Sequence, residues 1–244
     1  MALSQKNNLI IWTKKPQLKK HKQSAWSSNF WIKSQLSKIQ ESKRKNTLNR
    51  NEKIIFDLIN KRLKINRLLD IGGGLGSFYY SLKKKKLNLD YNILEDSKLI
   101  NKLKKIKFKK IKFIKKITLK KYNIVFLVSS LHYINNWKSF FRKILKNQPD
   151  YVAIIDLPVV NVPSFFGYQK YYSHQIKYRF QNKKELKFFF KNENYKLTKN
   201  LTNLKSKVSQ KKYFEKTFFK KKFFKIKSDT FIFKNIKKNN IRFK

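Results

Sequence analysis

Four of the five glycines in this chain lie within five consecutive positions, Gly72, Gly73, Gly74 and Gly76. They directly follow a short apolar run, Arg67–Ile71, and precede a segment with helical spacing, Ser77–Lys84. Glycine permits positive φ and lets the backbone approach a ligand closely. A rare residue gathered at one strand–helix junction therefore predicts an α/β domain whose ligand lies at the carboxyl end of that strand.

The rest of the chain alternates between strand and helix patterns. Strands are predicted at residues 67–71, 91–94, 112–114, 123–129, 151–155, 195–201 and 231–233. Helices are predicted at residues 24–46, 51–63, 77–84, 137–145 and 183–192, whereas residues 205–227 fit neither pattern. Alternation of this kind implies right-handed crossovers and a parallel sheet. We therefore expect an α/β fold with a doubly wound, mostly parallel, seven-stranded sheet and an N-terminal helical extension.

The net charge of +48 comes from 61 Lys and Arg against 13 Asp and Glu, and only 7 of the cations are arginine. Arginine's planar fork is preferred for phosphate and base recognition, and these lysines are spread over the whole chain. Besides lysine, the abundant residue types are Asn, Ile, Phe and Tyr, a set that the codons of an AT-rich genome favour. We interpret the charge as compositional bias, with a nucleic acid or an anionic membrane surface as the alternative partner.

The absence of cysteine excludes disulfides and thiolate metal sites, and no metal site is expected. No run approaches 18 apolar residues, and the N-terminus lacks the apolar core of a signal peptide. We therefore expect no membrane span and a cytoplasmic location. The sequence carries no signal for an oligomeric state.

The motif around the glycines reads Asp70-x-Gly72-x-Gly74-x-Gly76. A dinucleotide fingerprint would place its third glycine where this chain has Ser77, so a nicotinamide oxidoreductase is disfavoured. An acid, Glu95, ends the next predicted strand, where a carboxylate can accept hydrogen bonds from both ribose hydroxyls. An ordinary turn carboxylate is the alternative interpretation of Glu95.

The same motif resembles the first motif of the class I, Rossmann-like S-adenosylmethionine-dependent methyltransferases. The resemblance implies that S-adenosylmethionine is the cofactor and that Asp70, Gly72, Gly73, Gly74, Gly76 and Glu95 bind it. A second stretch, Ser129-Ser130-Leu131-His132-Tyr133, resembles the segment that lies beside the sulfonium in these enzymes. It implies cofactor contacts from Ser129, Ser130 and Leu131.

Other motifs limit the resemblance. The chain lacks the Asn-Pro-Pro-aromatic motif of adenine-N6 methyltransferases and the Pro–Cys pair of cytosine-C5 enzymes. Lys115–Lys116 and Ile117–Thr118 stand where many family members have an acid near the adenine amine. The adenine contact is therefore unassigned.

Residues 69–77, with Tyr79–Tyr80, resemble a group of methyltransferases encoded among surface-polysaccharide biosynthesis genes, and so does the stretch from Val162 to Leu186. This narrower resemblance implies methyl transfer to a small-molecule or glycan acceptor, at a hydroxyl. From composition and helical spacing we set apart a basic arm and helical cap at 1–50, and the remaining residues, 51–244, form the expected methyltransferase domain. Within that domain the cofactor half is about 66–157 and the substrate-side stretch about 158–182.

The candidates for a catalytic base are His174, Asp156 and His132. His174 lies in the aromatic stretch where an acceptor would enter, with an ordinary surface histidine as the alternative. Asp156 follows the fifth predicted strand. His132 lies at the predicted pocket rim, where packing beneath the cofactor is the favoured interpretation. The tyrosines at 168, 171, 172 and 178 are either a sugar-stacking platform or the aromatic core of a lid.

Two other functions stay open. An RNA-directed methyltransferase would bind RNA with steep salt dependence and methylate it. A non-catalytic polyanion-binding protein on the same fold would bind anions whether or not a cofactor analogue is present.

Overall fold

The computed structural model describes residues 11–12, 24–60, 67–83, 85, 87, 89–103, 111–171, 174–203 and 227–237. Several parts of the sequence predictions lie outside the described residues: residues 1–10 and 13–23 of the basic arm, Tyr172 of the expected tyrosine platform, and residues 205–226 of the unassigned stretch.

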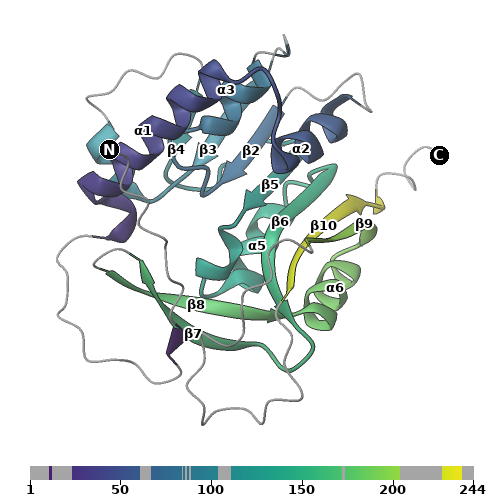
Figure 1. Ribbon diagram of the computed structural model, residues 1–244. Coiled ribbons are helices and arrows are strands. Elements are labelled where there is room, and N and C mark those ends of the chain that lie inside the picture. Colours follow the sequence, from purple (N-terminus) through teal and green to yellow (C-terminus); the bar gives the residue numbers. More distant parts are fainter. Residues whose placement is uncertain are drawn as a thin grey trace.

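Seven strands form the central sheet, in the order β4-β3-β2-β5-β6-β10-β9 (Figure 1). Their bounds are β2 Arg67–Ile71, β3 Asp90–Leu94, β4 Ile111–Ile114, β5 Ile124–Val128, β6 Tyr151–Val160, β9 Tyr195–Asn203 and β10 Lys227–Asn235. The five strands from β4 to β6 are parallel, and β10 lies antiparallel between β6 and β9. The predicted doubly wound, mostly parallel seven-stranded sheet is confirmed.

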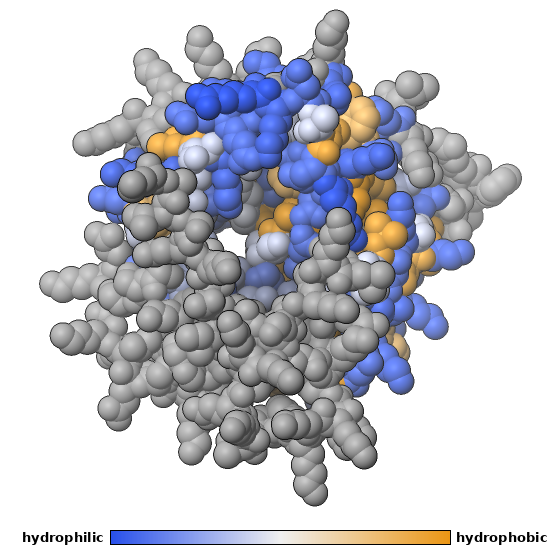
Figure 2. All heavy atoms as spheres, in the orientation of Figure 1, coloured by the Kyte–Doolittle hydropathy of each residue, from blue (hydrophilic) through white to orange (hydrophobic). Residues whose placement is uncertain are grey.

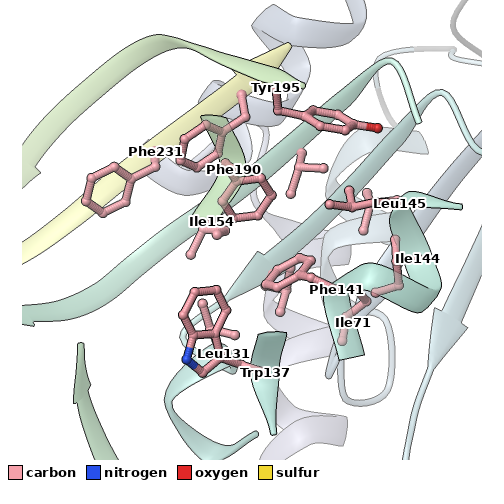
Figure 3. Packing of buried hydrophobic residues seen from close by; sticks show 14 of the residues in the cluster. Ile71, Leu131, Trp137, Phe141, Ile144, Leu145, Ile154, Phe190, Tyr195 and Phe231 are labelled. Carbon is pink, nitrogen blue, oxygen red and sulfur yellow. The ribbon is translucent and has the colours of Figure 1, made fainter. Parts of the chain in front are cut away.

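Helices cover both faces of this sheet because its central strands are apolar on both sides. In β5, Val125 and Leu127 face a core capped by helices α5 (Trp137–Leu145) and α6 (Lys183–Asn192). Figure 3 shows this core, where the rings of Trp137 and Phe141 lie against the strands. Ile124 and Phe126 face the other core, beneath α2 (Arg50–Asn60) and α3 (Ser77–Lys83). The predicted helices 137–145 and 183–192 have these same bounds.

The N-terminal helical extension begins with a 3-10 turn, η1 (Ala25–Ser27), followed by helix α1 (Asn29–Arg44). Serine side chains cap both starts: Ser24 Oγ accepts from the Trp26 N–H and Ser28 Oγ from the Trp31 N–H, each at 3.3 Å. α1 packs with the short helix α4 (Ser97–Leu103) through a small apolar cluster that includes Leu99 and Leu103.

Helix α2 starts with a reciprocal cap. The Glu52 N–H donates to Asn49 Oδ1 at 2.9 Å, and the Asn49 N–H donates to Glu52 Oε2 at 2.7 Å. The buried second oxygen of Glu52 accepts from Ser81 Oγ of α3 at 2.7 Å. The Ser81–Glu52 hydrogen bond joins α2 to α3 on one face of the sheet.

The aromatic stretch that follows β6 forms an antiparallel β-hairpin. β6 continues to Val160, five residues beyond its predicted end, and β7 (Phe165–Tyr171) then pairs antiparallel with β8 (His174–Asn182). The end of β8 runs parallel to the end of β6, and β1 (Ile11–Trp12) pairs with β7. These three strands extend the predicted seven into one ten-stranded sheet. The hairpin curves beneath the carboxyl ends of the parallel strands (Figure 1).

Among the helices that the structure describes, none combines the length and the apolar character that a membrane span requires.

Candidate functional site

Two adjoining cavities open at the carboxyl ends of the parallel strands. The first, here called the glycine-side cavity, has a volume of about 250 Å³ and is lined by Gly72, Glu95, Ser129 and Ser130 among others. The second, the lysine-side cavity, has a volume of about 610 Å³. The two share Leu94, Glu95, Ile134 and Phe140. Figure 2 shows the molecule hollowed near the centre of this face, with hydrophilic residues above the hollow.

The glycine turn takes a backbone path that other residues rarely adopt. Gly72, Gly74 and Gly76 have φ of +70°, +63° and +83°. The turn is held by the Gly72 N–H, which donates to Leu94 O at 2.9 Å, and by the Gly76 N–H, which donates to Gly73 O at 3.1 Å. A Cβ on Gly72 would lie 2.8 Å from Ser130 Cβ. Close packing and positive φ therefore both require glycine here.

Asp70 lies directly before this turn and is 2% exposed. Its Oδ2 accepts from the Tyr91 hydroxyl at 2.6 Å. The pKa of Asp70 is raised to about 7, chiefly by burial and in smaller part by the neighbouring Glu95, against the opposing effect of the Tyr91 hydrogen bond. A Cβ on Gly73 would meet this same carboxylate at 2.1 Å, so the strand-end acid packs directly beneath the glycine turn.

Glu95 lies at the end of β3 and reaches across to the turn. Its Oε1 accepts from the Gly74 N–H at 2.7 Å, and its Oε2 accepts from the Asp96 N–H at 3.1 Å. Burial raises the pKa of Glu95 to about 7 against these two hydrogen bonds. The structure thus brings together the acid and the glycines that the sequence separates by about 20 positions.

The segment after β5 divides between the cavity and the core. Ser129 and Ser130 line the glycine-side cavity, and Ser130 Oγ donates to Ile71 O at 2.7 Å. Ser129 has a φ of 51°, which turns the chain sharply at the strand end. Leu131, by contrast, is 2% exposed and belongs to the core that α5 covers.

The N-terminal extension closes the cavity, a role that motif analysis did not assign to it. Trp26 of η1 and Trp31 of α1 line the glycine-side cavity. Gln35, one helical turn further along α1, packs against the glycine turn, since a Cβ on Gly74 would lie 2.8 Å from Gln35 Oε1. Lys102 of α4 fastens η1 by donating to Ser27 O at 2.6 Å. The only sequence signal was the mostly helical spacing of the apolar residues from Trp26 to Ile39.

An aromatic cluster joins this extension to the hairpin. The ring of Trp26 lies 4.8 Å from Tyr133 and 5.0 Å from Tyr171, measured between centroids. The Tyr133 hydroxyl donates to Gln169 Oε1 of β7 at 2.8 Å. Tyr133 itself lines the glycine-side cavity. The hairpin therefore contacts the cavity through its inner face.

His132 lies within the short 3-10 turn η2 (Leu131–Tyr133) and is 5% exposed. Its ring lies 4.1 Å from that of Tyr133 and 4.3 Å from that of Tyr178. Burial lowers the pKa of His132 to about 3, so the imidazole is neutral near pH 7. Nδ1 has no hydrogen-bond partner in the described part of the chain. This environment suits packing better than proton abstraction.

The other two predicted bases lie in different surroundings. His174 begins β8 opposite Tyr171, so it shares the inner face of the hairpin with the residue that contacts Trp26. Asp156 lies within β6 at a φ of 54° and does not line either cavity. Its carboxylate accepts from Asn51 Nδ2 at 2.5 Å and from Ser228 Oγ at 3.3 Å.

The described tyrosines of the expected platform do not share one surface. Antiparallel register pairs Tyr171 with His174 and Gly167 with Tyr178, which places Tyr171 and Tyr178 on the inner face. Tyr168 is one residue out of phase and pairs with Lys177 on the outer face. Tyr178 is 8% exposed and packs on His132. The prediction of one platform built from four tyrosines is therefore wrong. Tyr171 and Tyr178, on the inner face, belong instead to the aromatic cluster.

No protein-family model matches this sequence, and no curated protein is similar enough to count as a relative. Solved structures do match the fold. A 1,6-didemethyltoxoflavin-N1-methyltransferase from Burkholderia thailandensis, with S-adenosylhomocysteine bound, aligns over 93% of this chain and 99% of its own at 11% identity and a TM-score of 0.50. A phosphoethanolamine N-methyltransferase 2 from Haemonchus contortus, also with S-adenosylhomocysteine, aligns over 86% of this chain and 59% of its own at 10% identity and a TM-score of 0.53. The chain has the Rossmann-like fold of class I methyltransferases.

Proposed function

We propose that this protein is an S-adenosylmethionine-dependent methyltransferase that acts on a small-molecule acceptor. The observation that carries the proposal is the position of Glu95, whose carboxylate lies 2.7 Å from the Gly74 nitrogen at one wall of the glycine-side cavity. A carboxylate beside a close-packed glycine turn is suited to a nucleoside whose ribose hydroxyls donate hydrogen bonds. The sharing of this fold by enzymes crystallised with S-adenosylhomocysteine supports the same cofactor.

The residues of the site fit this cofactor. Glu95 would accept from the ribose hydroxyls, and the glycine turn with Asp70 beneath it would hold the amino-acid portion. Trp26, Trp31 and Tyr133 supply an aromatic wall, which favours a sulfonium cation. When bound, the cofactor supplies an electrophilic methyl group. The protein contributes position, because displacement at that carbon needs acceptor and sulfonium in line.

The acceptor would enter between the N-terminal extension and the hairpin. The inner face of the hairpin presents Tyr171, Tyr178 and His174 next to Trp26 and Tyr133. Aromatic rings with polar edges suit a sugar-like acceptor, which offers C–H faces for stacking and hydroxyls for hydrogen bonding. We therefore favour a hydroxyl on a small molecule or glycan, in line with the resemblance to methyltransferases of surface-polysaccharide biosynthesis.

His174 is the base that we favour for removing a hydroxyl proton. It lies on the hairpin face that meets the aromatic cluster, whereas the carboxylate of Asp156 is held by Asn51 and Ser228. His132, with its pKa lowered to about 3, is too weak a base near neutral pH. Its neutral ring instead supports Tyr133 and Tyr178.

The decisive experiment is calorimetric binding of S-adenosylhomocysteine at about 0.15 M salt, which screens surface charge. Wild-type protein should bind it, and Glu95→Ala should abolish measurable binding because the ribose hydroxyls lose their acceptor. Glu95→Gln, which keeps the shape, should bind weakly. Asp57→Asn on helix α2 is the matched control that removes one carboxylate elsewhere. A folded wild type that does not bind, or a Glu95→Ala variant that binds equally well, contradicts the proposal.

A turnover assay tests the acceptor. Methyl transfer from labelled S-adenosylmethionine should be detected with hydroxyl-bearing sugars or sugar nucleotides, and His174→Ala should lower kcat with little change in cofactor affinity. Transfer to RNA in place of sugars would assign the chain to the alternative class.

A further inference from the structure

The lysine-side cavity has two chemically different parts. Its floor is apolar and is formed by Leu94, Ile117, Ile134 and Phe140. Its rim carries three lysines and two neutral polar side chains: Lys115, Lys116, Lys143, Asn136 and Ser139. Lys115 and Lys116 directly follow β4 and Lys143 lies in helix α5, so the fold rather than one run of sequence gathers the three lysines. The floor suits an uncharged base, but it does not account for the three cations.

The charges on this rim are not neutralised. Lys115 Nζ donates to the neutral Asn101 Oδ1 at 2.8 Å, and no ion pair involves Lys116 or Lys143 in the described residues. Other cations of α5 are paired, since Lys138 contacts Glu185 and Arg142 contacts Glu193.

The one carboxylate among the described residues that line this cavity is Glu95. Its two oxygens already accept from the Gly74 and Asp96 N–H groups. The three lysines therefore outnumber the one carboxylate of this shared space, and the net positive charge of a concavity attracts an anion.

We propose that the lysine rim of this cavity is a phosphate-binding subsite, which takes a phosphate-bearing ligand beside the bound cofactor. Lysine binds phosphate as a point charge, and Asn136 and Ser139 add neutral donors at the same rim. S-adenosylmethionine carries no phosphate, so the ligand is a second molecule or strand. The phosphate belongs either to a free polyphosphate, such as that of a nucleotide, or to the phosphodiester chain of an RNA.

This subsite goes beyond the proposed methyltransferase function and can be tested separately from it. The probe is inorganic tripolyphosphate, titrated calorimetrically at about 0.15 M salt to screen general surface charge. In the subsite variant, Lys115, Lys116 and Lys143 are all changed to alanine. In the matched control, the exposed Lys184, Lys191 and Lys196, which line neither cavity, are changed to alanine, so both variants lose the same charge.

The subsite variant should bind tripolyphosphate at least about tenfold more weakly than wild type, and the control variant should change it by less than about twofold. S-adenosylhomocysteine binding shows whether the cofactor site of each variant is intact. Equal losses in the two variants would overturn the subsite, and so would the absence of a loss in either variant with this probe and with the oligoribonucleotide described next.

A single-stranded oligoribonucleotide provides the second arm. If the subsite variant loses affinity for tripolyphosphate, the ligand is nucleotide-like. If it loses affinity for the oligoribonucleotide alone, with a shallower salt dependence, the phosphate comes from a phosphodiester chain. Either pattern supports the subsite. If the subsite variant and the control variant have equal affinities for both probes, the subsite is refuted.

Discussion

Replacement of Asp70 by asparagine should change how the stability of this protein depends on pH. Asp70 is 2% exposed, accepts from the Tyr91 hydroxyl at 2.6 Å, and has its pKa raised by burial to about 7. In the unfolded chain the same carboxyl has its ordinary value of 3.8. Asparagine keeps an oxygen that can accept from Tyr91 but cannot ionise, so Asp70→Asn removes the titration with little change in shape.

The direction follows from proton binding in the two states. Between pH 4 and 7 the folded state holds a proton on Asp70 that the unfolded state has released, so stability falls as pH rises through this range. The rise of the Asp70 pKa from 3.8 to about 7 corresponds to about 4 kcal/mol in the free energy of unfolding. About 2 kcal/mol of this free energy is lost between pH 5.5 and 8.0. Glu95, with its pKa also raised to about 7, adds a loss in the same direction.

The free energy of unfolding should be measured by urea titration at pH 5.5 and pH 8.0. Wild type should lose stability over this interval, and Asp70→Asn should lose about 2 kcal/mol less. Asp57→Asn controls for the removal of one negative charge. Equal pH dependence in wild type and Asp70→Asn would refute the reasoning, because it would mean that Asp70 ionises in the folded protein as easily as in water.

Two further expectations concern the walls of the glycine-side cavity. Gly72→Ala places a Cβ 2.8 Å from Ser130 Cβ at a φ of +70°. It should lower the free energy of unfolding in urea by about 1–3 kcal/mol and weaken S-adenosylhomocysteine binding. An unchanged urea midpoint would mean that the turn is not close-packed. Trp26→Ala removes an aromatic wall and should weaken the same binding about tenfold in calorimetry. Phe30→Ala, at a residue that is 53% exposed and outside the cavity lining, is its control, and equal affinities in the two variants would argue against an N-terminal wall.

Local patterns in the sequence were sufficient for the elements whose apolar spacing is strong. Helix α5 (Trp137–Leu145) buries Trp137, Phe141 and Ile144 at positions that recur every three to four residues, and its predicted bounds match the structure. The glycine turn was recognisable for a different reason. Positive φ and close contacts exclude other side chains there, so the backbone requirement is recorded in residue identity.

The aromatic stretch after β6 could not be assigned from its sequence. Phe165–Tyr171 and His174–Asn182 carry large side chains on both faces, so neither strand shows a simple alternation. Cation–aromatic contacts stabilise the outer face, where Lys177 Nζ and Arg179 Cζ lie 4.0 and 4.2 Å from the Phe166 ring centroid. The register, which separates Tyr168 from Tyr171 and Tyr178, exists only once the two strands have paired.

The sequence by itself determined the seven strands of the central sheet, most of the helices, the glycine turn and the acid at the end of the next strand. These follow from backbone conformation and local periodicity, which neighbouring residues decide. Only the tertiary structure decided that Trp26, Trp31 and Gln35 close the turn and that Asp156 is held by Asn51. It also decided that lysines from the segment after β4 and from α5 face one cavity. Those contacts join residues far apart in the chain, and their geometry depends on how the helices pack on the sheet, which no local pattern records.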